Sequence, residues 1–198
     1  MKRKQFLNVA GVSVAAAATG GIVSSVGQAL AATRSLARVS WPVARTRRAV
    51  FVPNGRNRVD EALMIWGVIP LQIKVSTNDT DGDLFVFEHA NMGKGGPPRH
   101  FHYEQDEWFR AVKGEFLFEV GDERFTLRPG DSLFAPRMVP HVWAYVGETP
   151  GKILIGFQPA GKMETFFQEA AKIADFAADE KLYRACEMEV VGPPLSLG

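Results

Sequence analysis

The chain has 198 residues and is 46% hydrophobic, which is enough for one domain with a sizeable core and too short for two comfortable ones. Its formal net charge of +1 hides an asymmetry, because residues 1–59 carry ten Lys or Arg and no carboxylate, whereas the remainder carries thirteen basic and 22 acidic residues. This acidic excess argues against a nucleic-acid partner for the body of the protein. The single cysteine, Cys186, excludes an internal disulfide.

Residues 1–31 have the features of a twin-arginine-like signal peptide. Residues 2–4 (Lys-Arg-Lys) form a positive n-region, residues 6–26 are uncharged and rich in Ala, Gly, Val and Ser, and residues 29–31 (Ala-Leu-Ala) fit the rule for a cleavage site. Lys4 stands where the twin-arginine consensus has its second Arg. We expect export to the periplasm or the medium, with cleavage before Ala32. The alternative is an uncleaved membrane anchor, since the stretch is long enough to span a bilayer.

Residues 32–62 form a basic N-terminal arm with seven arginines between Thr33 and Arg58. We interpret this arm as a flexible or clipped segment that packs along the body as an edge strand. An anionic-surface contact or an oligomer contact is the alternative.

Residues 63–160 consist of short β-rich runs separated by turn-forming sequences. The runs are residues 71–75, 84–89, 108–112, 116–120 and 133–135, and dense turn signals lie at 78–83 and 128–131. This pattern predicts an all-β fold, a small antiparallel β-barrel or jelly roll. In the C-terminal segment 161–198, apolar residues at helical spacing predict helices over 162–174 and 179–186, packed on the outside or one end of the barrel, with the Phe166–Phe167 pair as core.

Three of the four histidines lie in two short segments of the body. His100 and His102 occupy alternate positions of an extended run, so their imidazoles face the same side. Glu107 can join them only if the chain bulges or turns between Tyr103 and Asp106. His141 follows more than thirty residues later, and alternation places Trp143 and Tyr145 on its face. The fourth histidine, His89, lies outside both segments, and we give it no functional role.

Three neutral imidazoles and one carboxylate suit Mn, Fe, Co, Ni, Cu or Zn, with one or two positions left for water or substrate. The spacing His-x-His-x4-Glu-x6-Gly, filled by His100, His102, Glu107 and Gly114, resembles the first motif of the cupin superfamily. Its second motif is matched by Gly130, Pro136 and His141. Met138 stands where the family has Gly, and Tyr145 where it has Asn, so these departures concern the turn before His141 and the pocket wall.

The C-terminal tail, residues 189–195, is similar to the ending of single-domain bacterial cupins described as quercetin 2,3-dioxygenase-like. This resemblance implies a double-stranded β-helix with a divalent transition metal. It also implies a dioxygenase acting on a flavonol-like or other aromatic enol or phenol, in which Glu107 also accepts the substrate proton. Trp143, Tyr145 and Phe109 are the predicted substrate-binding residues, and Glu104, Asp106 and Tyr145 are further acid–base candidates.

Two other classes of function stay open on the sequence alone. One is a module that binds a metal and a small ligand without turnover, and the other is a non-oxidative cupin enzyme such as an isomerase. The metal, the substrate and the oligomeric state are left open, with a homodimer among the alternatives.

We predict that residues 1–31 are not part of the fold, because they offer no amphipathic stripe for a core. Their removal should leave the melting temperature and the metal content unchanged. Mass spectrometry of the exported protein should find a new N-terminus near Ala32. A large fall in melting temperature would make the segment structural, and an intact Met1 would favour the anchor.

Overall fold

The structure of the protein is a computed structural model that describes residues 45–59 and 63–197, apart from the side chain of Phe176. These residues belong to the second of the two units into which the chain divides, residues 40–198. The predicted signal peptide and residues 32–44 and 60–62 of the basic arm lie outside the described residues, so export and cleavage stay predictions. Within the described ranges, no helix has the length and apolar character needed to cross a membrane.

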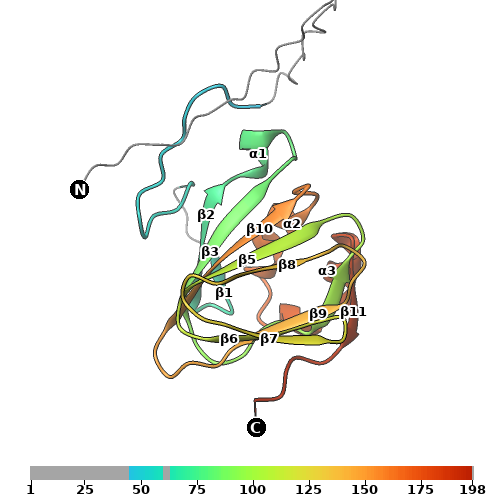
Figure 1. The fold of residues 1–198 in the computed structure, drawn as a ribbon. Helices are drawn as coiled ribbons and strands as arrows, with labels where there is room; N and C mark the ends of the chain where they lie inside the picture. Colours follow the sequence, from blue (N-terminus) through green and yellow to red (C-terminus); the bar gives the residue numbers. More distant parts are fainter. Residues whose placement is uncertain (1–44, 60–62, 198) are drawn as a thin grey trace, which may run out of the picture. The chain divides into compact units, whose positions relative to one another are not determined.

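The body is all-β, as the sequence predicts, and its described strands form two antiparallel sheets (Figure 1). The first sheet has the order β1-β2-β3-β10-β5-β8, with β1 Leu63–Ile65, β2 Ile69–Val75, β3 Phe85–Met92, β10 Gly151–Gln158, β5 Asp106–Lys113 and β8 Ser132–Ala135. The second has the order β11-β4-β9-β6-β7, with β11 Met188–Gly192, β4 Arg99–His102, β9 His141–Tyr145, β6 Phe116–Val120 and β7 Glu123–Leu127. The inner faces of the two sheets supply most of one hydrophobic core.

Alternation along the strands decides which side chains enter this core. On β10, the side chains of Ile153, Ile155 and Phe157 are at most 2% exposed and point into the core. Leu154, which lies between the first two, points outward and is half-buried. Neighbouring strands hold the register, because Phe157 lies between Phe85 of β3 and Glu107 of β5. A buried acidic residue therefore lies in the same row as two core phenylalanines.

The described part of the basic arm, residues 45–59, contains no strand, so the expected edge strand is not present there. Instead, the arm is tied down at single points. The amide of Arg58 donates to the carbonyl of Ile73 at 2.8 Å, and its guanidinium pairs with Asp79 at 2.9 Å. Asp79 belongs to a one-turn helix, α1 Thr77–Thr80, which overlaps the predicted turn at 78–83. Ser76 and Asp79 form a capping box at its N-terminus.

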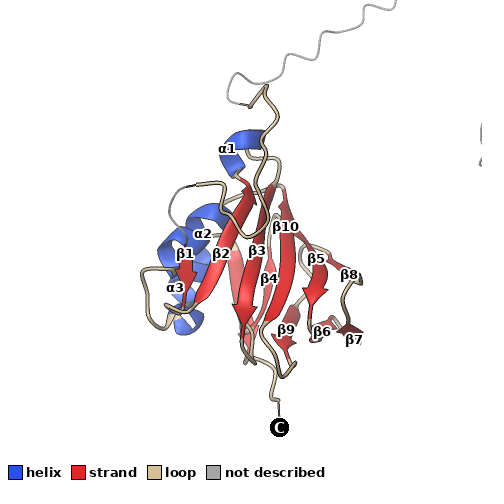
Figure 2. Ribbon diagram, turned by 90° about the vertical axis from the view of Figure 1, so that its left-hand side faces the viewer, coloured by secondary structure: helices blue, strands red, loops and turns tan. Residues whose placement is uncertain are grey.

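The C-terminal helices lie together beside β1 and β2 (Figure 2). They are α2 Met163–Ala170 and α3 Glu180–Ala185, with a single 3₁₀ turn at Phe176–Ala178 between them. Helix α2 ends before the predicted 174, because the amides of Lys172 and Ile173 donate to carbonyls three residues back and tighten the chain into turns. The tail then forms β11, which pairs with β4.

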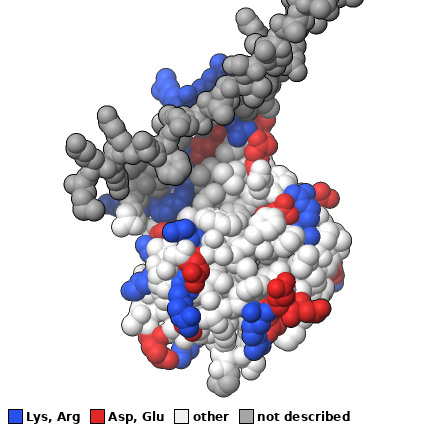
Figure 3. Space-filling view, viewed as in Figure 1, with Lys and Arg blue, Asp and Glu red and all other residues white. Residues whose placement is uncertain are grey.

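Charged side chains of both signs lie next to one another on the face drawn in Figure 3. Ion pairs among the described residues include Arg99 with Glu119 at 3.2 Å and Arg128 with Glu115 at 3.0 Å.

We predict that Gly96→Ala destabilises the barrel, whereas Gly93→Ala in the same loop does not. A Cβ at Gly96 would overlap the backbone carbonyl of Trp143, while nothing lies within 4 Å of a Cβ at Gly93. Such overpacking should lower the free energy of unfolding by about 1–3 kcal/mol, or the melting temperature by roughly 2–4 °C per kcal/mol. Thermal unfolding followed by circular dichroism measures this, and equal melting temperatures for both variants would contradict it.

Candidate metal centre

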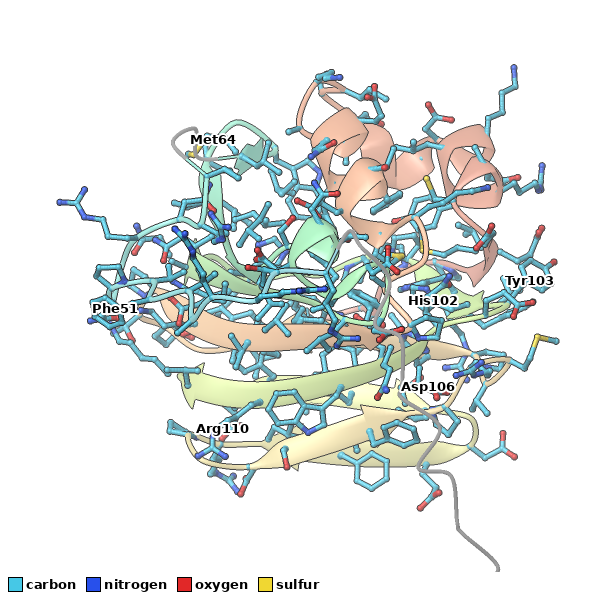
Figure 4. All side chains as sticks on the ribbon, turned by 90° about the horizontal axis from the view of Figure 1, so that it is seen from above. Phe51, Met64, His102, Tyr103, Asp106 and Arg110 are labelled. Atoms are coloured by element: carbon cyan, nitrogen blue, oxygen red, sulfur yellow. The ribbon has the colours of Figure 1, made fainter. Side chains whose placement is uncertain are left out.

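Two adjacent strands and one turn bring the four predicted ligands together. His100 and His102 alternate on β4 and are buried, and His100 lies directly opposite His141 of β9. The chain bends at Tyr103 and Glu104 before β5 begins, and this bend brings Glu107 inward as the second residue of β5. In Figure 4, His102 lies inside the molecule and Tyr103 lies at its rim. The predicted break between Tyr103 and Asp106 is therefore present.

The four ligand atoms all lie within 4.8 Å of one another, and the residues are buried. Oε2 of Glu107 is 3.2 Å from Nε2 of His102 and 2.8 Å from Nε2 of His141. Two ligands at right angles on one ion, each at ~2.1 Å, are about 3.0 Å apart. The spacing of the cluster therefore fits one transition-metal ion.

Backbone carbonyls orient two of the imidazoles from behind. Nδ1 of His100 is 2.8 Å from the carbonyl oxygen of Pro98, and Nδ1 of His141 is 3.1 Å from that of Val139. A carbonyl only accepts hydrogen bonds, so both Nδ1 atoms carry the proton and both Nε2 atoms present a lone pair. The lone pair of His141 then faces a carboxylate oxygen. Two acceptors at this distance repel each other unless a cation lies between them.

The protonation states of the cluster are those that bind a metal. Burial lowers the pKa of His100 to about 3, and the neighbouring His141 and His102 lower it further. Burial acts to raise the pKa of Glu107, but hydrogen bonds from His102 and His141, when their Nε2 atoms carry protons, hold this pKa at about 2, and a cation bound in place of these protons would act in the same direction. His100 is therefore neutral and Glu107 is ionised at neutral pH, as metal coordination requires.

The turn before His141 keeps its shape although Met138 replaces the expected Gly. Met138 adopts φ +65°, a left-handed conformation that usually requires glycine, and its amide donates to the carbonyl of His102 at 2.8 Å. The preceding residue, Arg137, binds Asp106 through its amide at 2.9 Å and its guanidinium at 2.8 and 3.1 Å. These bonds hold the His141 turn directly against the segment that carries His102 and Glu107.

A small cavity of about 50 Å³ opens beside the cluster. Helices α2 and α3 supply much of its wall, so the Phe166–Phe167 pair belongs to the cavity as well as to the core. The lining residues are mainly apolar or aromatic: Ile65, Trp66, His89, Met92, Pro97, His100, His102, Glu107, Trp143, Ile155, Phe157, Met163, Phe166, Phe167, Tyr183 and Met188.

The three predicted substrate-binding residues are all buried, but only one of the three lines this cavity. Trp143 is in its wall, whereas Phe109 and Tyr145 lie outside its lining. Phe109 packs edge-on against Phe118, with ring centroids 4.8 Å apart. Tyr145 bonds its hydroxyl to the carbonyl of Thr149, and its ring fills space left by glycines, including Gly114.

The acid–base candidates Glu104 and Asp106 also lie away from the cavity. Glu104 is exposed, and Asp106 is committed to Arg137, which holds the pKa of its carboxyl below the usual value.

Sequence reasoning missed two polar residues of the cavity, His89 and Tyr183. His89 is 5% exposed, and its Nδ1 has no hydrogen-bond partner. The alternation of Phe85, Phe87 and His89 on β3 was a signal for an inward His89. Tyr183 is 2% exposed and its ring lies edge-on to His100, with centroids 5.8 Å apart. No local signal pointed to Tyr183, because its place depends on how α3 docks.

The two antiparallel sheets form a double-stranded β-helix, and the three histidines and one glutamate buried in it could hold a metal ion. The Cupin domain family matches residues 81–157, which contain all four ligands. This segment is therefore a cupin domain.

Two curated proteins resemble part of the chain. An uncharacterized protein of Methanocaldococcus jannaschii is 33% identical over 55 residues, which are 28% of this chain and 44% of that protein. An oxidoreductase of Arthrobotrys oligospora is 32% identical over 60 residues, 29% of this chain and 24% of that protein. The chain thus spans less than half the length of each.

Solved structures resemble it as well. KdgF from a Halomonas species is 29% identical, with a TM-score of 0.40, covering 46% of this chain and 78% of that one. An RmlC-like cupin from Shewanella frigidimarina is 24% identical, with a TM-score of 0.46, covering 60% and 99%.

We predict that His100→Ala, His102→Ala and His141→Ala each lose most of the bound metal, because each removes one of four ligands. His89→Ala should keep the metal, since His89 is not part of the cluster. Elemental analysis after dialysis measures the metal content. Equal retention in all four variants would rule out the assignment.

Proposed function

We propose that this protein is a metal-dependent dioxygenase that acts on an aromatic enol or phenol. The observation that carries the proposal is the position of the four-ligand cluster, which opens onto a cavity walled by Trp143, Phe157, Phe166 and other apolar groups. A divalent transition metal held by His100, His102, Glu107 and His141 would draw electron density from a substrate oxygen and favour its deprotonated form. The cavity favours a substrate whose remaining surface is flat and apolar.

Glu107 is positioned to accept the substrate proton, and because its pKa is about 2, the transfer requires a metal that lowers the pKa of the substrate hydroxyl. Its contacts with both imidazoles involve Oε2, which leaves Oε1 without a hydrogen bond to any described residue. Glu107 also lines the cavity. In the proposed reaction, the hydroxyl proton of the substrate passes to Oε1, and both atoms of O2 are added to the deprotonated substrate. No external reductant is needed for this balance.

The size of the cavity bears on the substrate. Pockets that accept drug-sized ligands have volumes of roughly 300–1,000 Å³, whereas this cavity has about 50 Å³. We therefore favour a one-ring enol or phenol, which needs a smaller outward movement of the cavity wall than a flavonol would, and a flavonol would require α2 and α3 to move away from the barrel.

A second candidate is a protein that binds a small ligand at the metal without turning it over. The small cavity favours this alternative, because it gives O2 and substrate little room together. Oxygen uptake by the metal-loaded protein with a series of phenols, enols and flavonols separates the two functions. If none of these compounds supports O2 uptake, the dioxygenase is excluded, and the binding function or an isomerase is left.

We predict that Glu107→Gln keeps much of the metal and loses turnover. The amide retains the shape of the side chain but cannot accept the substrate proton, so the rate should fall by roughly 10²–10⁴-fold. Oxygen uptake and elemental analysis on the same sample measure both effects. Glu104→Gln is the matched control, because Glu104 is exposed in the preceding turn and should leave both unchanged. Full activity with full metal content in Glu107→Gln would contradict the proton-accepting role.

A further inference from the structure

His89 is a polar residue of the cavity that the metal centre does not use. It belongs to β3, is 5% exposed and lines the cavity. Its ring contacts are aromatic, with Phe87 at 4.9 Å and Phe167 at 6.1 Å between centroids. Its Nδ1 atom is buried and has no hydrogen-bond partner. Buried polar atoms of this kind are uncommon in proteins, and each calls for an explanation such as a ligand.

The register of the first sheet places His89 and Glu107 at different levels of the barrel. Glu107 lies in a row with Phe157 and Phe85, whereas His89 lies opposite Ile153 of β10, four residues along β3 from Phe85. Four residues of a strand rise about 13 Å, and both side chains face inward. The cavity between them is walled by apolar side chains, including Ile155, Phe157 and Phe167.

We propose that His89 is the second polar anchor of the ligand, and that the ligand is a small aromatic molecule with polar groups at two ends. One oxygen lies at the metal centre and an uncharged hydroxyl at the far end hydrogen-bonds to His89. The first contact rests on the proposed function, but the second concerns binding and requires no turnover.

The chemistry of the far end selects an uncharged group. Burial lowers the pKa of His89 to about 3, so its imidazole is neutral and offers one N–H donor and one acceptor. A hydroxyl can use either nitrogen. A carboxylate or ammonium at the same place would lose its hydration among apolar residues without an opposite charge, which disfavours charged ligands.

Tyr183 provides the internal comparison. Its ring lies against His100, at the metal end of the cavity, and no hydrogen bond of its hydroxyl is present in the described part of the chain. Removing this hydroxyl should therefore change the binding of all phenols alike, whereas removing the imidazole of His89 should affect ligands with a second hydroxyl.

The test uses the zinc-loaded full chain, anaerobic conditions, and phenol and hydroquinone as probes in isothermal titration calorimetry. The two equivalent hydroxyls of hydroquinone give a twofold statistical advantage, and one further neutral hydrogen bond should raise the preference to about 5- to 20-fold. His89→Phe and His89→Leu should reduce this preference to about twofold while phenol affinity and zinc content stay unchanged. His89→Asn, which retains an amide near the position of Nδ1, should recover part of it.

Tyr183→Phe and Met92→Leu are the controls, and both should retain the wild-type preference. The proposal is overturned if wild type prefers hydroquinone no more than twofold, if neither probe binds, or if the preference survives in folded His89→Phe. Oxygen uptake distinguishes the two proposals. If the wild-type protein consumes O2 but shows no preference for hydroquinone, the role of His89 alone is overturned. If it prefers hydroquinone through His89 but consumes no O2, the dioxygenase alone is overturned.

Discussion

The barrel is built around the need to bury one carboxylate and three imidazoles in an apolar interior. Glu107, His102 and His141 are each at most 4% exposed, and an unpaired polar group at such depth costs free energy. Backbone carbonyls satisfy the outer nitrogens of His100 and His141, and the inner nitrogen of His141 lies 2.8 Å from Oε2 of Glu107. In a neutral imidazole with the proton on Nδ1, the Nε2 atom cannot donate a hydrogen bond. A cation would resolve this arrangement, so a metal held by these residues would couple its binding to folding of the centre.

The two ligand segments are held to each other by contacts outside the centre. Asp106 precedes the predicted ligand Glu107, and Arg137 lies four residues before the predicted ligand His141. The guanidinium of Arg137 forms a bidentate ion pair with Asp106, and the amide of Arg137 donates a further hydrogen bond to the same carboxylate. Exposed ion pairs of this kind contribute little to stability, about 0–1 kcal/mol. Their effect is better understood as geometric, because the planar guanidinium and the Met138 amide fix the distance between the two segments.

The sequence predicted those parts of the centre that depend on local spacing. Alternation placed His100 and His102 on the same face of a strand. Glu107 lies an odd number of residues further on, so a straight strand would turn it to the other face, and this predicted the turn before it. The predicted shared face of His141 and Tyr145 agrees with the ring contacts of β9, because Trp143 shares Phe109 with His141 and Phe116 with Tyr145. However, four residues of strand separate their levels by about 13 Å, so Tyr145 reaches a pocket of glycines instead of the cavity.

The cavity wall was harder to predict, because an amphipathic helix does not reveal which surface its apolar face will meet. Phe166 and Tyr183 show the required pattern of burial, but their contact with each other, at 5.0 Å between centroids, is a product of tertiary packing. His89 was overlooked for a different reason. Its inward direction agrees with the alternation of Phe85, Phe87 and His89 on β3, but β3 lies outside both motifs, so no local spacing connects His89 with the metal ligands.

The helices also decide how large a ligand the centre can accept. Glu164 of α2 is 8% exposed and accepts hydrogen bonds from Ser76, at 3.0 Å, and from the amide of Thr77, at 2.7 Å. Hydrogen bonds to a charged group contribute about 1.5–3 kcal/mol each. Moving α2 aside for a large ligand would break these bonds and expose the phenylalanines beneath it. The narrow cavity is therefore a stable feature, and it supports the proposal of a small ligand with one polar group at the metal centre and another at His89.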